Sequence, residues 1–69
     1  MRYLCFINGV ETPIQDGAVP NVPGASVALF FLNQENEYQL IVDTVAGPDD
    51  RFLSRRLEPF GLRAVAGLA

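Results

Sequence analysis

Two apolar runs separated by a short polar break dominate the hydrophobic pattern of this chain. Residues 26–32 read SVALFFL, residues 38–45 read YQLIVDTV, and the break between them reads NQENE. Side chains of a strand alternate between the two faces of a sheet, and runs of this length bounded by polar residues are typical of strands. The pattern therefore predicts a β-hairpin that holds most of the large apolar side chains.

The two arms of this hairpin differ in their alternation. In the first arm both faces are apolar, with Val27, Leu29 and Phe31 on one face and Ala28, Phe30 and Leu32 on the other. Such a strand needs cover on both sides. In the second arm Tyr38, Leu40 and Val42 alternate with Gln39, Ile41 and Asp43. We therefore expect the first arm to be central and the second to be peripheral.

The register of the hairpin depends on its turn. A two-residue turn at Glu35-Asn36 would place Phe31 opposite Leu40 and Leu29 opposite Val42, because Asn tolerates the positive φ that such a turn needs. A three-residue loop would change these pairs.

The N-terminal third predicts a second hairpin and a loop. Residues 2–7 form a strand that is apolar on both faces, Asn8-Gly9 is a strong turn signal, and residues 10–14 return as a short edge strand because Pro13 lacks an amide hydrogen. Residues 15–25 carry two turn pairs and two prolines, and predict an ordered connecting loop. This loop is interpreted as a connector, with a binding loop as the alternative.

The C-terminal third predicts one helix and one strand. Pro48-Asp49-Asp50 is typical of a helix start, with Pro48 at the first helical position or Asp49 as the N-cap, and Pro59 limits the helix to residues 49–57. Residues 62–68 are expected to form a last strand. The fold class is therefore α+β: a small, mostly antiparallel sheet of four to five strands with one short helix packed on one face, in the order β-β-β-β-α-β.

Length and composition bound the stability of this fold. The chain has 69 residues, which suits a single small domain over residues 1–69, and an initial Met1 suggests a complete protein. Domains of this size bury only about 60% of their unfolded surface and often need a disulfide, a metal or a second subunit. With one cysteine and no histidine, we expect the support to come from a second copy. One short helix covers only one sheet face, so the other face needs either the loop 15–25 or another chain.

Net charge and hydropathy limit the classes of partner that we expect. The net charge of −3 disfavours nucleic acid and anionic membranes. No apolar stretch approaches the ~20 residues of a membrane span, and the N-terminus does not read as a signal peptide. A cytoplasmic location is expected, and an unpaired cysteine agrees with it.

The residue types needed for most catalytic sites are missing. Without histidine no Ser-His-Asp or Cys-His pair can form, and Ala46-Gly47-Pro48 does not match a phosphate-binding loop. Asp49 and Asp50 are interpreted as residues that favour the helix start, although with Asp43 they could in principle bind magnesium. Cys5 is expected to be a buried, unreactive thiol. No cofactor or metal is expected.

A protein partner is the best-supported class of function. We expect a small non-enzymatic interaction module that acts as an adaptor, regulator or inhibitor of a partner protein and forms a homodimer. The candidate contact surfaces are the exposed sheet face (Phe30, Leu32 and Ile41), an edge strand, or the basic helix face (Arg51, Arg55 and Arg56). One alternative is a nucleic-acid-associated regulator that uses the arginine-bearing helix. The other is a small ligand binder or enzyme that uses the loop 15–25 and requires a cavity beside it.

Overall fold

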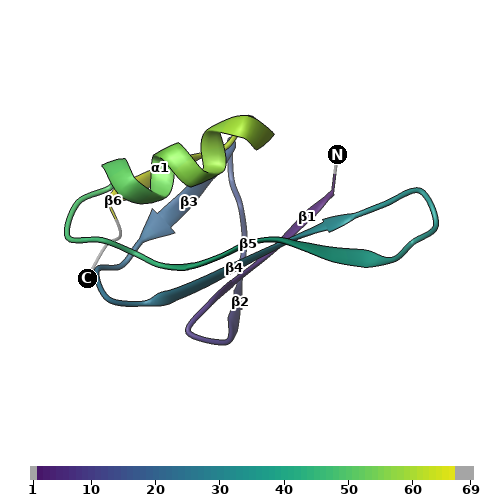
Figure 1. Ribbon diagram of the computed structural model, residues 1–69, viewed down its shortest axis with the longest axis horizontal. Helices are drawn as coiled ribbons and strands as arrows, with labels where there is room; N and C mark the ends of the chain where they lie inside the picture. The colour runs from purple at the N-terminus through teal and green to yellow at the C-terminus, as the bar shows by residue number, and fades with distance from the viewer. Residues whose placement is uncertain (1, 67–69) are drawn as a thin grey trace.

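Six strands and two short helical segments make up residues 2–66, which are the residues that the computed structural model describes (Figure 1). In chain order they are β1 (Tyr3–Ile7), β2 (Val10–Thr12), β3 (Ala18–Asn21), β4 (Ser26–Leu32), β5 (Tyr38–Val45), the helix α1 (Arg51–Leu57), the 3-10 turn η1 (Glu58–Phe60) and β6 (Arg63–Ala66). Four strands form an antiparallel sheet in the order β2-β1-β4-β5, and β3 pairs with β6 in a separate parallel ribbon. The predicted α+β class is confirmed.

The first hairpin has the predicted turn. Asn8 and Gly9 both have positive φ, 51° and 78°, as a two-residue turn of the primed type requires. The turn is also tied to the next strand, because the Asn8 amide donates to the Ser26 carbonyl at 2.8 Å and the Asn8 Oδ1 accepts from the Ser26 amide at 2.9 Å. The return strand β2 ends just before Pro13 and lies at the sheet edge, as expected.

Strand β4 lies between β1 and β5, so the first arm of the long hairpin is central and the second is peripheral, as predicted. Tyr3, Cys5 and Ile7 of β1 lie opposite Phe31, Leu29 and Val27. Residues that are directly opposite share a face. These six side chains therefore belong to one face of the sheet, and the alternate residues of both strands belong to the other.

The second arm of the hairpin, β5, differs from the predicted register because the strand pairing shifts by one residue within it. Leu29 lies opposite Val42 as predicted, but Phe30 lies opposite Leu40 and Phe31 opposite Gln39, so Ile41 has no residue opposite it. An extra residue of this kind is a β-bulge, and it reverses the alternation of the strand beyond it. Leu40 and Val42 consequently face opposite sides of the sheet. The turn itself spans residues 33–37, with Asn33 Oδ1 accepting the amides of Glu35 and Glu37.

The predicted connecting loop contains a strand that the sequence did not indicate. Residues 18–21 form β3, which pairs in parallel with β6, so the order is β-β-β-β-β-α-β and not β-β-β-β-α-β. The segment is short and includes Pro20, which is tolerated because this ribbon has only two strands. The Arg63 amide donates to the Gly17 carbonyl at 2.9 Å, and the Arg63 guanidinium donates to the Asp16 carbonyl at 2.8 Å.

The helix begins two residues later than predicted. Asp50 is the N-cap, and it makes no side-chain capping bond; instead the Asp49 Oδ1 accepts the Arg51 amide at 3.0 Å. Pro59 ends the α-helix as expected, and the chain continues for one 3-10 turn before Gly61 turns it out with a φ of 73°. Strand β6 confirms the predicted last strand over residues 63–66, whereas residues 67 and 68 of that prediction lie outside the described residues.

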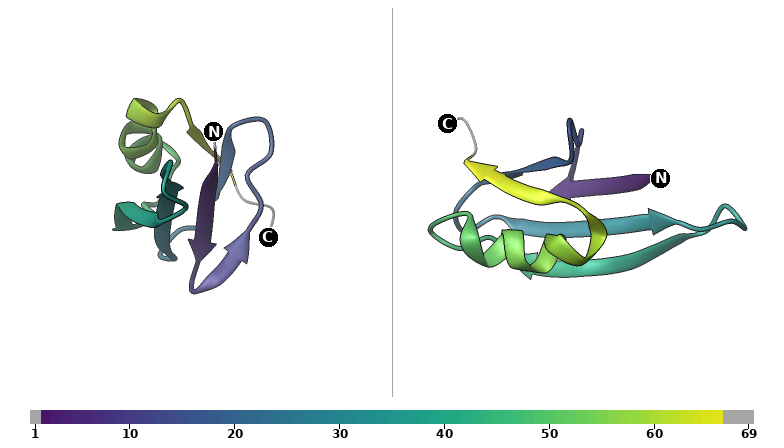
Figure 2. Two further views of the ribbon diagram at one scale, coloured as in Figure 1. Left: turned by 90° about the vertical axis from the view of Figure 1, so that its right-hand side faces the viewer. Right: turned by 90° about the horizontal axis from the view of Figure 1, so that it is seen from above.

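All of the additional elements pack on the same face of the four-stranded sheet. The core joins Cys5, Val27, Leu29 and Val42 of the sheet to side chains of the covering layer. Those side chains come from β3, α1 and β6: Val19, Leu53, Leu57 and Ala64. Figure 2 shows the same arrangement, with α1 and the β3–β6 ribbon on one side of the sheet. The segment 15–25 therefore covers the face that the helix also covers and leaves the second face without cover.

Candidate functional site

The uncovered side of the sheet is an apolar surface built from three strands. The strand register places eight apolar side chains on it, and we call this surface the open face: Leu4, Phe6, Ala28, Phe30, Leu32, Tyr38, Leu40 and Val45. Leu40 and Tyr38 are 48% and 54% exposed, and the side chains of β1 and β4 are half-buried by one another. None of the eight belongs to the core on the other side. Large apolar patches of this kind are typical of interaction sites.

The centre of the open face is aromatic and carries no charge. The rings of Phe6 and Phe30 meet edge to face with centroids 5.8 Å apart, which fixes their orientation in a geometry that aromatic pairs favour. The register places two acidic residues, Glu11 and Asp43, on the same face, but on the outer strands β2 and β5. An apolar centre with charges at its margin is the usual arrangement of a protein–protein interface.

The predicted interface residues divide between two sides of the molecule. Phe30 and Leu32 lie on the open face, as the alternation of β4 predicts. Ile41 does not join them, because it occupies the bulge of β5 and packs against the core on the covered side. Arg51, Arg55 and Arg56 lie on α1, which also belongs to the covered side (Figure 2). The predicted set is therefore not one continuous surface.

The exposed side of α1 is basic and includes one aromatic ring. Arg51, Arg55 and Arg56 are exposed, and the Arg56 guanidinium lies 4.9 Å above the Phe52 ring centroid, in a cation–π contact. No ion pair joins two side chains within residues 2–66. The opposite side of the helix holds the buried Leu53 and Leu57.

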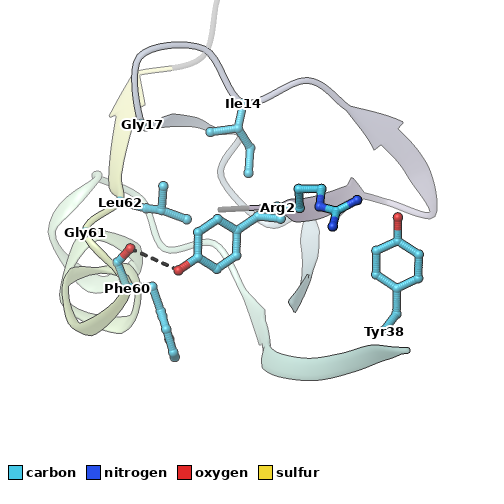
Figure 3. Close-up of a pocket in the computed structure, with 8 residues that line it drawn as sticks. Arg2, Ile14, Gly17, Tyr38, Phe60, Gly61 and Leu62 are labelled. Carbon is cyan, nitrogen blue, oxygen red and sulfur yellow. Dashed lines mark hydrogen bonds between the residues drawn. The ribbon is translucent and has the colours of Figure 1, made fainter. Parts of the chain in front are cut away.

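An open cavity of about 540 Å³ lies beside the start of β1. Its walls come from the sheet end, from the segment before β3, and from the end of η1 with the residues that follow it (Figure 3). Tyr3 forms part of the wall, with its hydroxyl donating to the Phe60 carbonyl at 3.3 Å and its ring 6.5 Å from that of Phe60. Arg2 is the one charged residue among those that line it. A ligand-binding function of the loop 15–25 requires a cavity beside the loop. The cavity described here is lined in part by Ile14 and Gly17.

The remaining candidate groups do not form a catalytic or metal-binding constellation. Asp43 lies on the open face while Asp49 and Asp50 lie before α1, and within residues 2–66 no three Cys, Asp or Glu side chains gather as metal ligands. Cys5 is buried in the core, and this burial raises the pKa of its thiol. A raised pKa reduces the thiolate fraction that nucleophilic chemistry needs.

Several residues of the open face and of the cavity were not predicted from the sequence. Leu4 and Phe6 are apolar alternates of a strand that was correctly predicted to be apolar on both faces, so their signal was present. Leu40 was assigned to the wrong face of the sheet because the hydrophobic pattern of the sequence does not reveal a β-bulge. The cavity brings Arg2 together with residues near position 60, and no local signal predicts that contact.

Comparisons with known proteins add no assignment. Neither helical segment within residues 2–66 is long and apolar enough to cross a membrane. No protein-family model, curated protein or solved structure matches this chain.

Proposed function

We propose that this chain is a non-enzymatic protein–protein interaction module that forms a homodimer through its open face. One observation carries the proposal: α1, β3 and β6 all cover one side of the sheet, and the opposite side is apolar from β1 to β5. Burying such a surface against a second copy removes apolar area from water at about 25 cal/mol per Å². A second copy presents the same aromatic centre and therefore offers a matching apolar surface.

The size of the open face sets the expected strength of this dimer. Three strands about 4.8 Å apart, with a rise of about 3.4 Å per residue along β4, give the open face a flat footprint of about 340 Å² per copy. Stable interfaces bury about 800 Å² per partner, and smaller ones belong to transient complexes. Side chains project from the plane of the sheet, so the area buried in a dimer exceeds this flat footprint. We therefore expect a reversible dimer with a dissociation constant in the micromolar range.

The cellular setting is part of the same proposal. The unpaired Cys5 is buried and protected from oxidation, which is compatible with the reducing cytoplasm. A module of this kind would act on a partner protein as an adaptor, regulator or inhibitor, using surfaces that the dimer leaves free. The basic side of α1 lies away from the open face and is such a surface.

Light scattering after size exclusion, over a hundredfold concentration range, tests the dimer. We expect the mass to fall from twice the chain mass toward the chain mass on dilution. Leu40→Lys places a charge on the open face at an exposed edge position and should give a monomer at every concentration. Val10→Lys is the matched control, because Val10 is 66% exposed and lies opposite Ile7 on the other face.

Circular dichroism and urea unfolding would show that both variants remain folded. The proposal is refuted if the unmodified chain is monomeric at about 1 mM, a concentration at which an interaction of only about 4 kcal/mol would already be half-formed. It is also refuted if the two lysine variants dissociate alike.

A further inference from the structure

We infer that the cavity beside β1 binds a small monocarboxylic acid with an aromatic or branched apolar body, held by Arg2. The volume of about 540 Å³ falls in the range of small-molecule sites. This inference does not rest on the proposed dimer: of the residues that line the cavity only Tyr38 belongs to the open face, and the others lie at the end of the sheet and in the covering layer.

The charge of the lining residues selects the ligand. Arg2 is the one charged side chain among them, it is exposed, and it forms no ion pair with the described residues. A guanidinium matches a carboxylate with two parallel N–H···O bonds. Figure 3 shows the guanidinium extending toward the hydroxyl end of Tyr38, so a second donor lies on the same side of the cavity. We therefore expect the ligand to carry a single anionic group.

The remaining wall is apolar and fixes the body of the ligand. Ile14, Leu62 and the ring of Phe60 lie on the side of the cavity away from Tyr38 (Figure 3), and Tyr3 also lines the cavity. Tyr3 is held by its hydrogen bond to Phe60 and by a ring contact with Phe31 at 5.6 Å. A wall that is already fixed loses little entropy when a ligand binds. An aromatic ring can stack against it without rearrangement of the sheet.

The opening of the cavity is maintained by the backbone. Gly61 is one of the lining residues, its φ is 73°, and a Cβ built on it would meet no atom within 4 Å. Residues other than glycine rarely adopt this conformation, so a side chain that would partly fill the cavity is disfavoured at this position.

Titration by NMR with 3-phenylpropionate tests the inference, and the neutral 3-phenylpropanamide is the matched probe. We expect the acid to bind at least tenfold more tightly than the amide, with the largest shifts at the methyl groups of Ile14 and Leu62. Arg2→Gln should weaken the acid at least tenfold and leave the amide unchanged. Arg55→Gln removes an exposed arginine from α1 and should change the affinity less than twofold.

Equal affinity of acid and amide would overturn the inference, and so would an Arg2→Gln variant that binds the acid as the unmodified chain does. Shifts centred on Phe6 and Phe30 would also overturn it, because they would place the probe on the open face. Repeating the titration with Leu40→Lys separates this result from the dimer: we expect the same affinity for the acid whether or not that variant is monomeric.

Discussion

Ser54 connects the helix to the covering ribbon, and its replacement by alanine is the sharpest test of how this layer is held. The Ser54 Oγ accepts the Ala64 amide at 3.0 Å and donates to the Ala64 carbonyl at 3.4 Å. Ala64 is 4% exposed and lies in β6, whose other edge pairs with β3. The hydroxyl therefore takes the place of a neighbouring strand for one residue of β6.

The expected loss of stability follows from the Ala64 amide that Ser54→Ala leaves without an acceptor. The variant removes the acceptor of a buried amide, which costs about 1–3 kcal/mol. Alanine is the better helix former by about 0.5 kcal/mol, which offsets part of this cost. The net loss is about 0.5–2.5 kcal/mol, against a total of about 3–10 kcal/mol expected for a domain of this length. At about 4–8 °C per kcal/mol, the melting temperature should fall by about 2–20 °C.

Urea unfolding at a fixed protein concentration measures this loss, and hydrogen exchange locates it. The amide of Ala64 should lose protection more than the amides of β4. Arg55→Ala is the control, because it changes helix propensity at the next position, where the side chain is exposed, and we expect its stability to stay within about 0.5 kcal/mol. Unchanged stability of Ser54→Ala, or an Ala64 amide that stays protected, would show that the hydroxyl does not hold β6.

Two further predictions concern the N-terminal hairpin. Because burial raises the pKa of Cys5, the unfolded chain loses this proton first as the pH rises; the stability that the thiol contributes is complete below about pH 9 and falls above it. Cys5→Ala should remove that part of the alkaline loss, and an identical pH profile of the two proteins in urea unfolding would contradict the assignment. Asn8→Ala should cost about 2 kcal/mol, because it forces alanine into positive φ and removes the acceptor of the Ser26 amide. Asn8→Gly should restore the part due to φ, which thermal unfolding can measure; equal losses for both variants would exclude a contribution from backbone strain.

The sequence predicted those parts of the fold that rest on local patterns. Asn8-Gly9 specified the first turn, Pro13 and Pro59 ended β2 and α1, and the two-sided apolar pattern of residues 26–32 identified the central strand. Each of these is a constraint that acts within a few residues of its cause. Such constraints are visible without knowledge of the partner strands.

The features that were missed depend on pairs of distant residues. Strand β3 exists because β6 lies beside it, and four residues that include Pro20 carry no strand signal of their own. The bulge at Ile41 decides which side of the sheet Leu40 faces, yet the alternation of β5 reads the same with or without it. Of the three residues expected on the exposed sheet face, the register places Phe30 and Leu32 on the open face, whereas Ile41 packs against the core on the other side. The cavity at Arg2 was unpredictable because four separate segments of the chain form it.

The pairing of β3 with β6 has a consequence for the order in which this chain folds during synthesis. The hairpins β1–β2 and β4–β5 close short loops and can form as soon as they leave the ribosome, whereas β3 must wait for β6, the last described element to emerge. Until then the open face is exposed, the other face lacks the β3–β6 ribbon, and β3 has no partner strand. A nascent chain arrested before residue 63 is therefore the form most exposed to aggregation and most in need of a chaperone.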